Sequence, residues 1–299
     1  YKHSFALGSI AGSACLGMLI PPSVLLIVWG IITEDSIGKL FVAGVIPGIV
    51  LAVFFAAYNM VSARMNPSIA PEPDSIGDTT PLTRGQIYSG VSIIGLIILV
   101  LGGIWGGFFT ATEAAGVGAL AGMCIAIGKG LRFKGLVECI IDAGKTSAPI
   151  MILLITAGMY SRFLSLADID SLIVGAMSSA GLDGALGLLV MVIIWLLLGM
   201  LLDSISIILL TVPLFMTLSS GMDPYAFAIF GILAIEAGLL TPPFGLIVYT
   251  VKGVLSGTGH DVPLNQIFSG SIPYWIMMLI VMILVVIFPG LASWLTTFV

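Results

Sequence analysis

The sequence predicts an all-α polytopic membrane protein, and three observations point to this fold class. Of the 299 residues, 59% are hydrophobic and 8% are charged, whereas an ordinary soluble domain carries about 25% charged residues. Several apolar runs are long enough to cross a bilayer. A membrane segment interrupted by two prolines occurs twice. Since lipid offers the backbone no hydrogen-bond partner, segments that cross it in this chain must be helices.

The apolar runs define the order of the elements. We expect membrane crossings at residues 5–31, 45–63, 87–104, 113–128, 147–165, 225–251 and 273–289. Residues 66–84 contain four prolines among acidic and small polar residues, which predicts a loop. Amphipathic stretches at 36–46, 131–146 and 262–272 are expected to lie at the membrane interface.

Residues 185–218 do not fit a single crossing. As one helix they would extend about 51 Å, against a hydrocarbon core of about 30 Å. Halves at 185–198 and 204–218 have the length of a re-entrant hairpin, which enters and leaves the membrane on the same side. The tip of this hairpin would be residues 199–204.

The basic residues indicate the orientation of the chain. If Lys2 is on the inner side, only Lys39 and Arg162 fall outside. The inner set is Lys2, Arg64, Arg84, Lys129, Arg132, Lys134, Lys145 and Lys252. Reading 185–218 as one full crossing would move only Lys252 to the outer side. The charge distribution therefore supports the orientation through many residues but supports the hairpin through one. The net charge of −5, with basic residues scattered, predicts no nucleic-acid surface.

A Gly-x-x-x-Pro-Pro string occurs at Gly17–Pro22 and again, 221 residues later, at Gly238–Pro243. A second shared string follows each copy, at Gly44–Pro47 and Gly270–Pro273, 226 residues apart. Two matches in the same order predict an internal repeat. The crossing count makes the first copy run outward and the second inward, so the repeat is inverted. Inverted repeats with broken helices are typical of secondary transporters.

The broken segments supply candidate cation ligands. A proline pair removes two amide donors and frees carbonyl oxygens, and Gly17 and Gly238 let the backbone unwind. The hydroxyls of Ser13 and Thr241 are close in sequence. Hard oxygen ligands suit Na⁺ rather than a transition metal. The alternative is a proline kink that serves packing alone, and the inverted duplication argues against it.

Asp203 is the only charge between Asp183 and Asp223. A central Asp costs roughly 2.5–3.5 kcal/mol to insert in a membrane, so we expect it to face a cavity or the interior with a partner. The alternative, compatible with function, is a cap on the second half of the hairpin. The helix N-terminus near Ser204 favours an anionic substrate group. Glu236 is expected to be buried, where it would steady the unwound segment or a cation, or serve polar packing.

Four strings in the chain carry a further signal. They are LGMLIPPSVLLIVWGIITEDSIGKLFVAGVIPG, GGFFTATEAAGVGAL, GMLLDSISIILLTVP and EAGLLTPPFGLIVYTVKGV. They resemble the large membrane subunit of tripartite ATP-independent periplasmic (TRAP) transporters, the DctM-like family, and the resemblance covers essentially the whole chain. It implies an elevator-type transporter, not an enzyme, that takes up an organic acid together with Na⁺.

The resemblance also implies roles for successive segments. A transport domain would combine the broken helix of the first repeat, 1–35, with the hairpin and second broken helix, 166–260. The remaining segments would be a cytoplasmic loop at 66–86 and interfacial arms with scaffold helices at 36–65, 87–165 and 261–299. The family's first hairpin would precede Tyr1, so we expect this chain to be the C-terminal part of a longer polypeptide.

In the family, Na⁺ lies between hairpin tips and unwound segments. Carried onto this chain, the candidate metal ligands are Gly12, Gly17, Pro21, Gly199, Asp203, Gly238, Thr241 and Pro242. The candidate substrate-binding residues are Ser13, Asp203 and Ser204. The implied partners are a small membrane subunit or fused small-subunit domain, a periplasmic substrate-binding protein, the lipid bilayer and a carboxylate substrate. The implied location is the bacterial inner membrane.

Three other functions remain open at this point. The first is a Na⁺/dicarboxylate symporter of related architecture that works without a binding protein. The second is a membrane-embedded enzyme such as an intramembrane protease, although the crossings contain no paired catalytic Asp, Ser-His arrangement or His-rich metal site. The third is a purely structural subunit.

Overall fold

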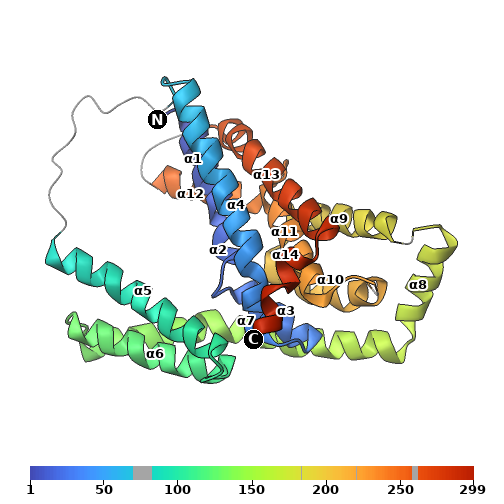
Figure 1. Cartoon of the computed structure of the whole chain (residues 1–299), viewed down its shortest axis with the longest axis horizontal. Coiled ribbons are helices and arrows are strands. Elements are labelled where there is room, and N and C mark those ends of the chain that lie inside the picture. The colour runs from blue at the N-terminus through green and yellow to red at the C-terminus, as the bar shows by residue number, and fades with distance from the viewer. Residues whose placement is uncertain (70–82, 183, 220, 258–261) are drawn as a thin grey trace. The chain divides into compact units, whose positions relative to one another are not determined.

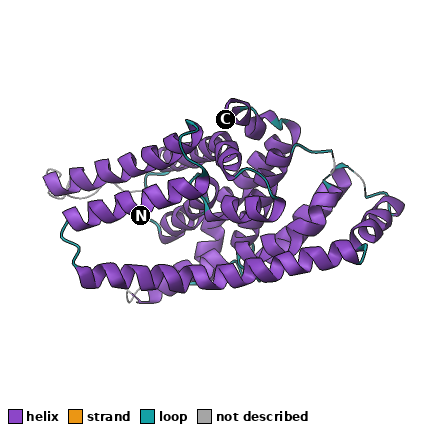
Figure 2. Cartoon of the chain, turned by 90° about the horizontal axis from the view of Figure 1, so that it is seen from below, coloured by secondary structure: helices purple, strands orange, loops and turns teal. Residues whose placement is uncertain are grey.

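The computed structural model describes residues 1–69, 83–182, 184–219, 221–257 and 262–299. Within these ranges the chain forms α-helices and one short 3-10 helix, and no strand is present (Figure 2). The all-α prediction is therefore confirmed. The chain divides into two compact units, one with Tyr1–Glu72 and Thr156–Phe298 and the other with Pro73–Ile155.

The helices follow one another along the chain (Figure 1). They are α1 (His3–Ala14), α2 (Leu16–Leu19), α3 (Val24–Thr33), α4 (Ile37–Met65), α5 (Arg84–Trp105), α6 (Ala111–Gly128), α7 (Phe133–Leu166), α8 (Ile169–Ser179), α9 (Ala185–Gly199), α10 (Ser204–Leu218), α11 (Pro224–Leu240), α12 (Leu246–Gly257), α13 (Leu264–Ile287), α14 (Gly290–Ser293) and η1 (Leu295–Phe298). Among the described residues, α4, α5, α6, α7 and α13 are long and apolar enough to cross a membrane, with α1 to α3 as a bent sixth candidate. A multi-pass membrane protein follows from this count.

The first broken helix comprises α1, α2 and α3. The stretch His3–Leu19 and helix α3 meet at an angle of 41°, because the proline pair at the break has no amide hydrogen to continue the helical hydrogen bonds. Ser23 hydrogen-bonds to the backbone on both sides of the break. Its side chain donates to the Met18 carbonyl and accepts from the Leu26 amide at 3.5 Å. The expected crossing at 5–31 is therefore broken where the sequence predicts.

The second broken helix comprises α11 and α12, which replace the crossing expected at 225–251. The Asp223 side chain caps α11 by accepting from the Tyr225 and Ala226 amides, each at 3.0 Å. The helix then ends at Leu240, and α12 resumes at Leu246. The Pro21–Pro22 and Pro242–Pro243 peptide bonds are both cis.

Helices α9 and α10 form the expected hairpin, with bounds that agree with the predicted halves to within one residue. The two legs have different partners. Helix α9 packs against α11, and α10 packs against α3. The hairpin therefore joins the second broken helix to α3, the second half of the first, while its re-entrant path in a membrane stays a prediction.

An aromatic cluster forms the centre of this contact. The rings of Trp195 and Phe215 lie 5.1 Å apart, those of Trp195 and Phe230 5.7 Å apart, and those of Trp29 and Phe227 5.7 Å apart. Both tryptophans are fully buried. Since the rings come from α3, α9, α10 and α11, the first broken helix shares one core with three consecutive helices that lie far from it in sequence.

Three long helices differ from the expected arms and scaffold crossings. Each arm and the crossing after it form one continuous helix, namely α4, α7 and α13, with Pro47, Pro149 and Pro273 inside them. Membrane helices tolerate an internal proline, so the arms continue into the crossings. Helices α1, α4 and α13 lie side by side (Figure 1). A Cβ on Gly8 of α1 would lie 2.1 Å from the Gly270 oxygen of α13, so these two backbones touch.

The second unit contains the pair α5 and α6, which pack on each other. Both helices begin with a capping box, at Thr83 with Gln86 and at Thr110 with Glu113. The first box starts α5 at Arg84, inside the range predicted as a loop. Residues 70–82, which make up most of that predicted loop, lie outside the described residues. The short helix α8 has no counterpart among the predicted elements.

Candidate functional site

The hairpin tip and the second broken helix touch through two glycines. A Cβ on Gly199 would lie 2.7 Å from the Gly238 Cα, and a Cβ on Gly238 would lie 2.9 Å from the Gly199 Cα. Since real Cβ atoms do not approach so closely, only glycine fits at either position. Two candidate cation-site residues, chosen from separate parts of the sequence, therefore lie in direct contact.

Close to this contact, Ser204 at the start of α10 donates from its hydroxyl to Glu236 Oε1 of α11 at 2.7 Å. Glu236 is 1% exposed and Ser204 is 7% exposed. The second carboxyl oxygen, Glu236 Oε2, is buried without a hydrogen-bond partner among the described residues. A buried carboxyl with an unsatisfied oxygen is costly unless a proton or a cation accompanies it. Glu236 is therefore the residue around which a cation site can form.

Glu236 also contacts the first broken helix. The Cys15 sulfur, at the junction of α1 and α2, lies 4.0 Å from the Glu236 backbone oxygen, across 221 residues of sequence. The same interval separates the two proline pairs, so Cys15 and Glu236 occupy equivalent positions in the two copies. Equivalent residues of a two-fold repeat touch only near the axis that relates the copies. In the predicted inverted repeat, the axis that relates the two copies would therefore pass beside Glu236.

Asp203 is exposed at the hairpin tip. Its carboxylate accepts from the Ser206 amide at 3.1 Å and from the Ser206 hydroxyl at 2.5 Å. This is the N-cap arrangement of α10, the alternative open from the sequence. The expected interior partner for Asp203 is not found among the described residues, and its partner is a hydroxyl in the first turn of its own helix.

Thr241 anchors the second break to α13. Its hydroxyl donates to the Ala237 oxygen at 2.8 Å and accepts from the Trp275 ring nitrogen at 3.0 Å. Between this break and the hairpin tip lies an open pocket of about 240 Å³, lined by Met200, Leu201, Phe244, Leu246 and Tyr249. The second proline pair therefore adjoins both the pocket and the Gly199–Gly238 contact.

The candidates of the first repeat are more scattered. Gly12 is buried against the Tyr274 ring, since a Cβ there would lie 2.3 Å from that ring. Gly17 and Ser13 are exposed, and the Ser13 hydroxyl donates to the Ile10 oxygen at 3.2 Å. Pro21 is buried at the break. No hydrogen bond in the described part of the chain joins Ser13 to the hairpin.

The comparison with known families decides the identity. The sequence model of the family described as "Tripartite ATP-independent periplasmic transporter, DctM component" matches residues 1–291. The chain belongs to this DctM family. The resemblance seen in the sequence strings is therefore confirmed, and so is the expectation of a transporter component rather than an enzyme.

Three relatives show the range of the family. The C4-dicarboxylate TRAP transporter large permease protein DctM of Pseudomonas aeruginosa is 30% identical over 96% of this chain and 66% of its own length. The ectoine/5-hydroxyectoine TRAP transporter large permease protein UehC of Ruegeria pomeroyi is 30% identical over 99% of this chain and 68% of its own. The sialic acid TRAP transporter large permease protein SiaM of Vibrio cholerae is 28% identical over 97% and 66%. The chain spans about two thirds of the length of these DctM relatives.

The structure adds residues that were absent from the candidate ligands. Glu236 was expected to be buried and either to steady the unwound segment or a cation or to serve polar packing, but it was not among the candidate ligands. Its sequence signal was an acid inside an apolar run next to a break. Ser23 was missed, although a hydroxyl directly after a proline pair is a sequence signal for a cap. The position equivalent to Ser23 in the second repeat is Phe244, which has no hydroxyl. Leu239, equivalent to Met18, therefore lacks the hydroxyl donor that its counterpart has.

Proposed function

We propose that this DctM-family chain belongs to the large membrane subunit of a TRAP transporter that couples uptake of an organic acid to Na⁺. The observation that carries the proposal is the buried Glu236 carboxyl, bonded to the hairpin at Ser204 on one oxygen and unsatisfied on the other. A carboxyl in this position links the hairpin to the broken helix. Cation binding at its free oxygen would change the free energy of that contact.

The residues around Glu236 fit Na⁺. The unsatisfied Oε2 supplies a hard, anionic oxygen, and the break beside it frees backbone carbonyls. Gly199, Gly238, Thr241 and Pro242 would hold the ion together with Glu236. Bound Na⁺ supplies the positive charge that neutralises this carboxylate and links uptake to the sodium gradient. Gly12, Gly17 and Pro21 are proposed for a second ion at the first break.

The proposed substrate group is a carboxylate near the hairpin tip. The N-terminus of α10, which starts at Ser204, carries a partial positive charge that favours an anion. The exposed Asp203 carboxylate repels the same anion. Cation binding nearby would offset that repulsion, so the two charges together give a physical basis for coupling. Ser13 is the substrate contact proposed on the first repeat.

The proposed partners are a small membrane subunit and a periplasmic substrate-binding protein in the bacterial inner membrane. One relative, the isethionate TRAP transporter permease protein DctMQ of Oleidesulfovibrio alaskensis, is matched over only 45% of its length. Its greater length is what a fused small subunit would give. A symporter of related architecture without a binding protein is the competing function.

Reconstitution tests the proposal. The full-length permease and its small subunit are placed in proteoliposomes, and uptake of a labelled organic acid is measured with and without the binding protein. The proposal requires uptake that depends on both an inward Na⁺ gradient and the binding protein. Uptake that is unchanged when K⁺ replaces Na⁺ would exclude Na⁺ coupling. Uptake that is equal without the binding protein would favour the symporter.

A further inference from the structure

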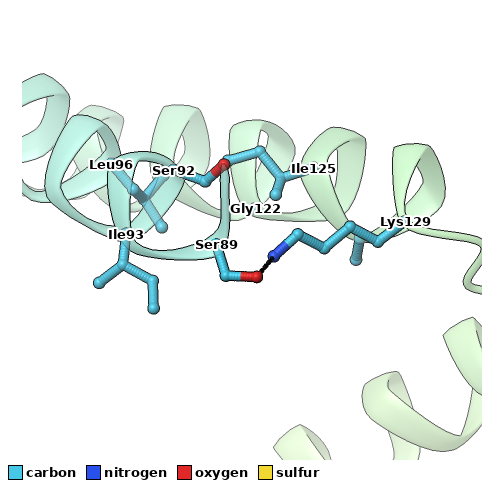
Figure 3. Close-up of a pocket in the computed structure, with 8 residues that line it drawn as sticks. Ser89, Ser92, Ile93, Leu96, Gly122, Ile125 and Lys129 are labelled. Atoms are coloured by element: carbon cyan, nitrogen blue, oxygen red, sulfur yellow. Dashed lines mark hydrogen bonds between the residues drawn. The ribbon is translucent and has the colours of Figure 1, made fainter. Parts of the chain in front are cut away.

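The groove between α5 and α6, in the second unit, has an amphipathic lining. A pocket of about 270 Å³ opens along the two helices (Figure 3). Its lining is serine and lysine at one end and mainly aliphatic beyond, with Ser89, Ser92, Ile93, Leu96, Ile125 and Lys129 as the main side chains. Both helices are long and apolar enough to cross a membrane. If both helices cross the bilayer, the groove runs across it, with its polar end at the C-terminal end of α6.

Lys129 defines the polar end. Its ammonium group donates to the Ser89 hydroxyl at 2.6 Å and lies 5.5 Å from the centre of the Tyr88 ring. Figure 3 shows the lysine reaching from the end of α6 across to Ser89 on α5. The ring and the hydroxyl hold the ammonium group at the mouth of the groove, because a cation is attracted to the face of an aromatic ring.

The charge of Lys129 has no protein counterpart in the described part of the chain. The ion pair found there joins Lys145 to Asp142, and no carboxylate lies within ion-pair distance of Lys129. An ammonium group has three hydrogens to donate, and Ser89 accepts one of them. Lys129 is therefore able to bind an anion. Other basic residues are close in sequence, namely Arg132 and Lys134, which the charge distribution places on the inner side.

We propose that this groove binds an anionic phospholipid of the inner leaflet. The Lys129 ammonium group would bind the phosphate, and an acyl chain would lie along Ile93, Leu96 and Ile125. The Ser89 and Ser92 hydroxyls, which donate to the Gly85 and Tyr88 carbonyl oxygens, would make the mouth of the groove polar. Charge complementarity selects this ligand, since basic pockets between membrane helices on the cytoplasmic side bind anionic headgroups. Gly122 keeps the floor of the groove open, because a Cβ there would have one neighbour, Leu96 Cδ2 at 3.9 Å.

Lipid binding by the purified full-length protein tests the proposal. Delipidated protein is titrated with phosphatidylglycerol and, separately, with phosphatidylcholine, and bound lipids are counted by native mass spectrometry. We expect tighter binding of phosphatidylglycerol, weakened about fivefold by Lys129→Gln and retained by Lys129→Arg. Lys134→Gln is the matched control, since it removes the same charge outside the groove lining. Equal binding of both lipids, or equal effects of Lys129→Gln and Lys134→Gln, overturns the proposal.

A second variant tests the apolar part of the groove. Gly122→Leu would fill it, and Gly116→Leu is the control on the same helix, where a Cβ meets no neighbour. We expect Gly122→Leu alone to reduce phosphatidylglycerol binding, with thermal unfolding measured for both variants. If Gly122→Leu instead releases the small membrane subunit and leaves lipid binding intact, the groove is a protein interface and the proposal is wrong. If Gly122→Leu does not fold, the Lys129 series decides.

Discussion

The backbones of Gly199 and Gly238 touch, so that a methyl group on either residue would lie less than 3 Å from the other. This contact places the tip of the hairpin directly on the second broken helix. Ser204 and Glu236 add a hydrogen bond of 2.7 Å beside it. The close packing of the hairpin tip against α11 therefore depends on the glycine contact and on this hydrogen bond. Substitutions can test the two separately.

Replacing Gly199 or Gly238 by alanine should destabilise the protein by about 1–3 kcal/mol, because the added methyl group forces two packed backbones apart. The measurement is thermal unfolding of the purified protein. Gly253→Ala on α12 is the control, since a Cβ there has no neighbour within 4 Å. An unfolding temperature equal to that of the control would contradict the close contact.

Glu236→Gln should weaken Na⁺ binding about tenfold or more, since interactions with a charged group contribute about 1.5–3 kcal/mol. The shape and the bond to Ser204 can be kept by the amide oxygen, so folding should persist. Na⁺ binding is measured by calorimetry on the full-length protein, and Ser271→Ala serves as a control for a buried polar change on α13. If Glu236→Gln binds Na⁺ as the wild type does, a proton rather than a cation accompanies the carboxyl.

Two substitutions of Asp203 should separate its cap from its charge. Asp203→Asn keeps a good N-cap and removes the charge whose repulsion of the substrate is proposed to be offset by Na⁺. Stability should therefore be retained, while the part of uptake into proteoliposomes that depends on Na⁺ falls. Asp203→Ala removes both and should also lose about 1 kcal/mol of stability. Undiminished uptake with Asp203→Asn would leave Asp203 a capping residue only.

The Trp275 ring nitrogen donates to the Thr241 hydroxyl at 3.0 Å. Substituting each partner separately distinguishes a structural role of Thr241 from a role in Na⁺ binding. Trp275→Phe removes that bond alone, whereas Thr241→Val also removes the hydroxyl next to the proposed Na⁺ site. We expect Thr241→Val to raise the Na⁺ concentration needed for half-maximal uptake and Trp275→Phe to leave it unchanged. Equal shifts would mean that Thr241 acts by anchoring the break to α13.

Removing the Ser23 hydroxyl should loosen the first break. Ser23→Ala loses the cap of α3 and the donor to the Met18 oxygen, which should cost about 1 kcal/mol of stability. Thermal unfolding checks this, with Ser13→Ala as the control because that hydroxyl is exposed. An unchanged unfolding temperature would mean that water satisfies the Met18 oxygen.

The sequence predicted the hairpin and both breaks closely because the signals for them are local. An apolar run too long for one crossing and too short for two, with a capping residue at its centre, leaves few solutions. A proline pair ends a helix wherever it stands. The arms were predicted less well. Boundaries between arm and crossing were expected near residues 46, 146 and 272, but α4, α7 and α13 continue through them with Pro47, Pro149 and Pro273 inside, since a membrane helix can lose one hydrogen bond and continue.

By itself, then, the sequence determined the class, the breaks, the hairpin and the equivalence of the two copies, all of which depend on composition and spacing. Only the tertiary structure decided which of these parts meet. That Glu236 contacts both Ser204 and Cys15 depends on how α1, α10 and α11 pack. Such contacts join residues far apart in the chain. They depend on how side chains and glycine backbones fit together in three dimensions, and this fit leaves no periodic pattern in the sequence.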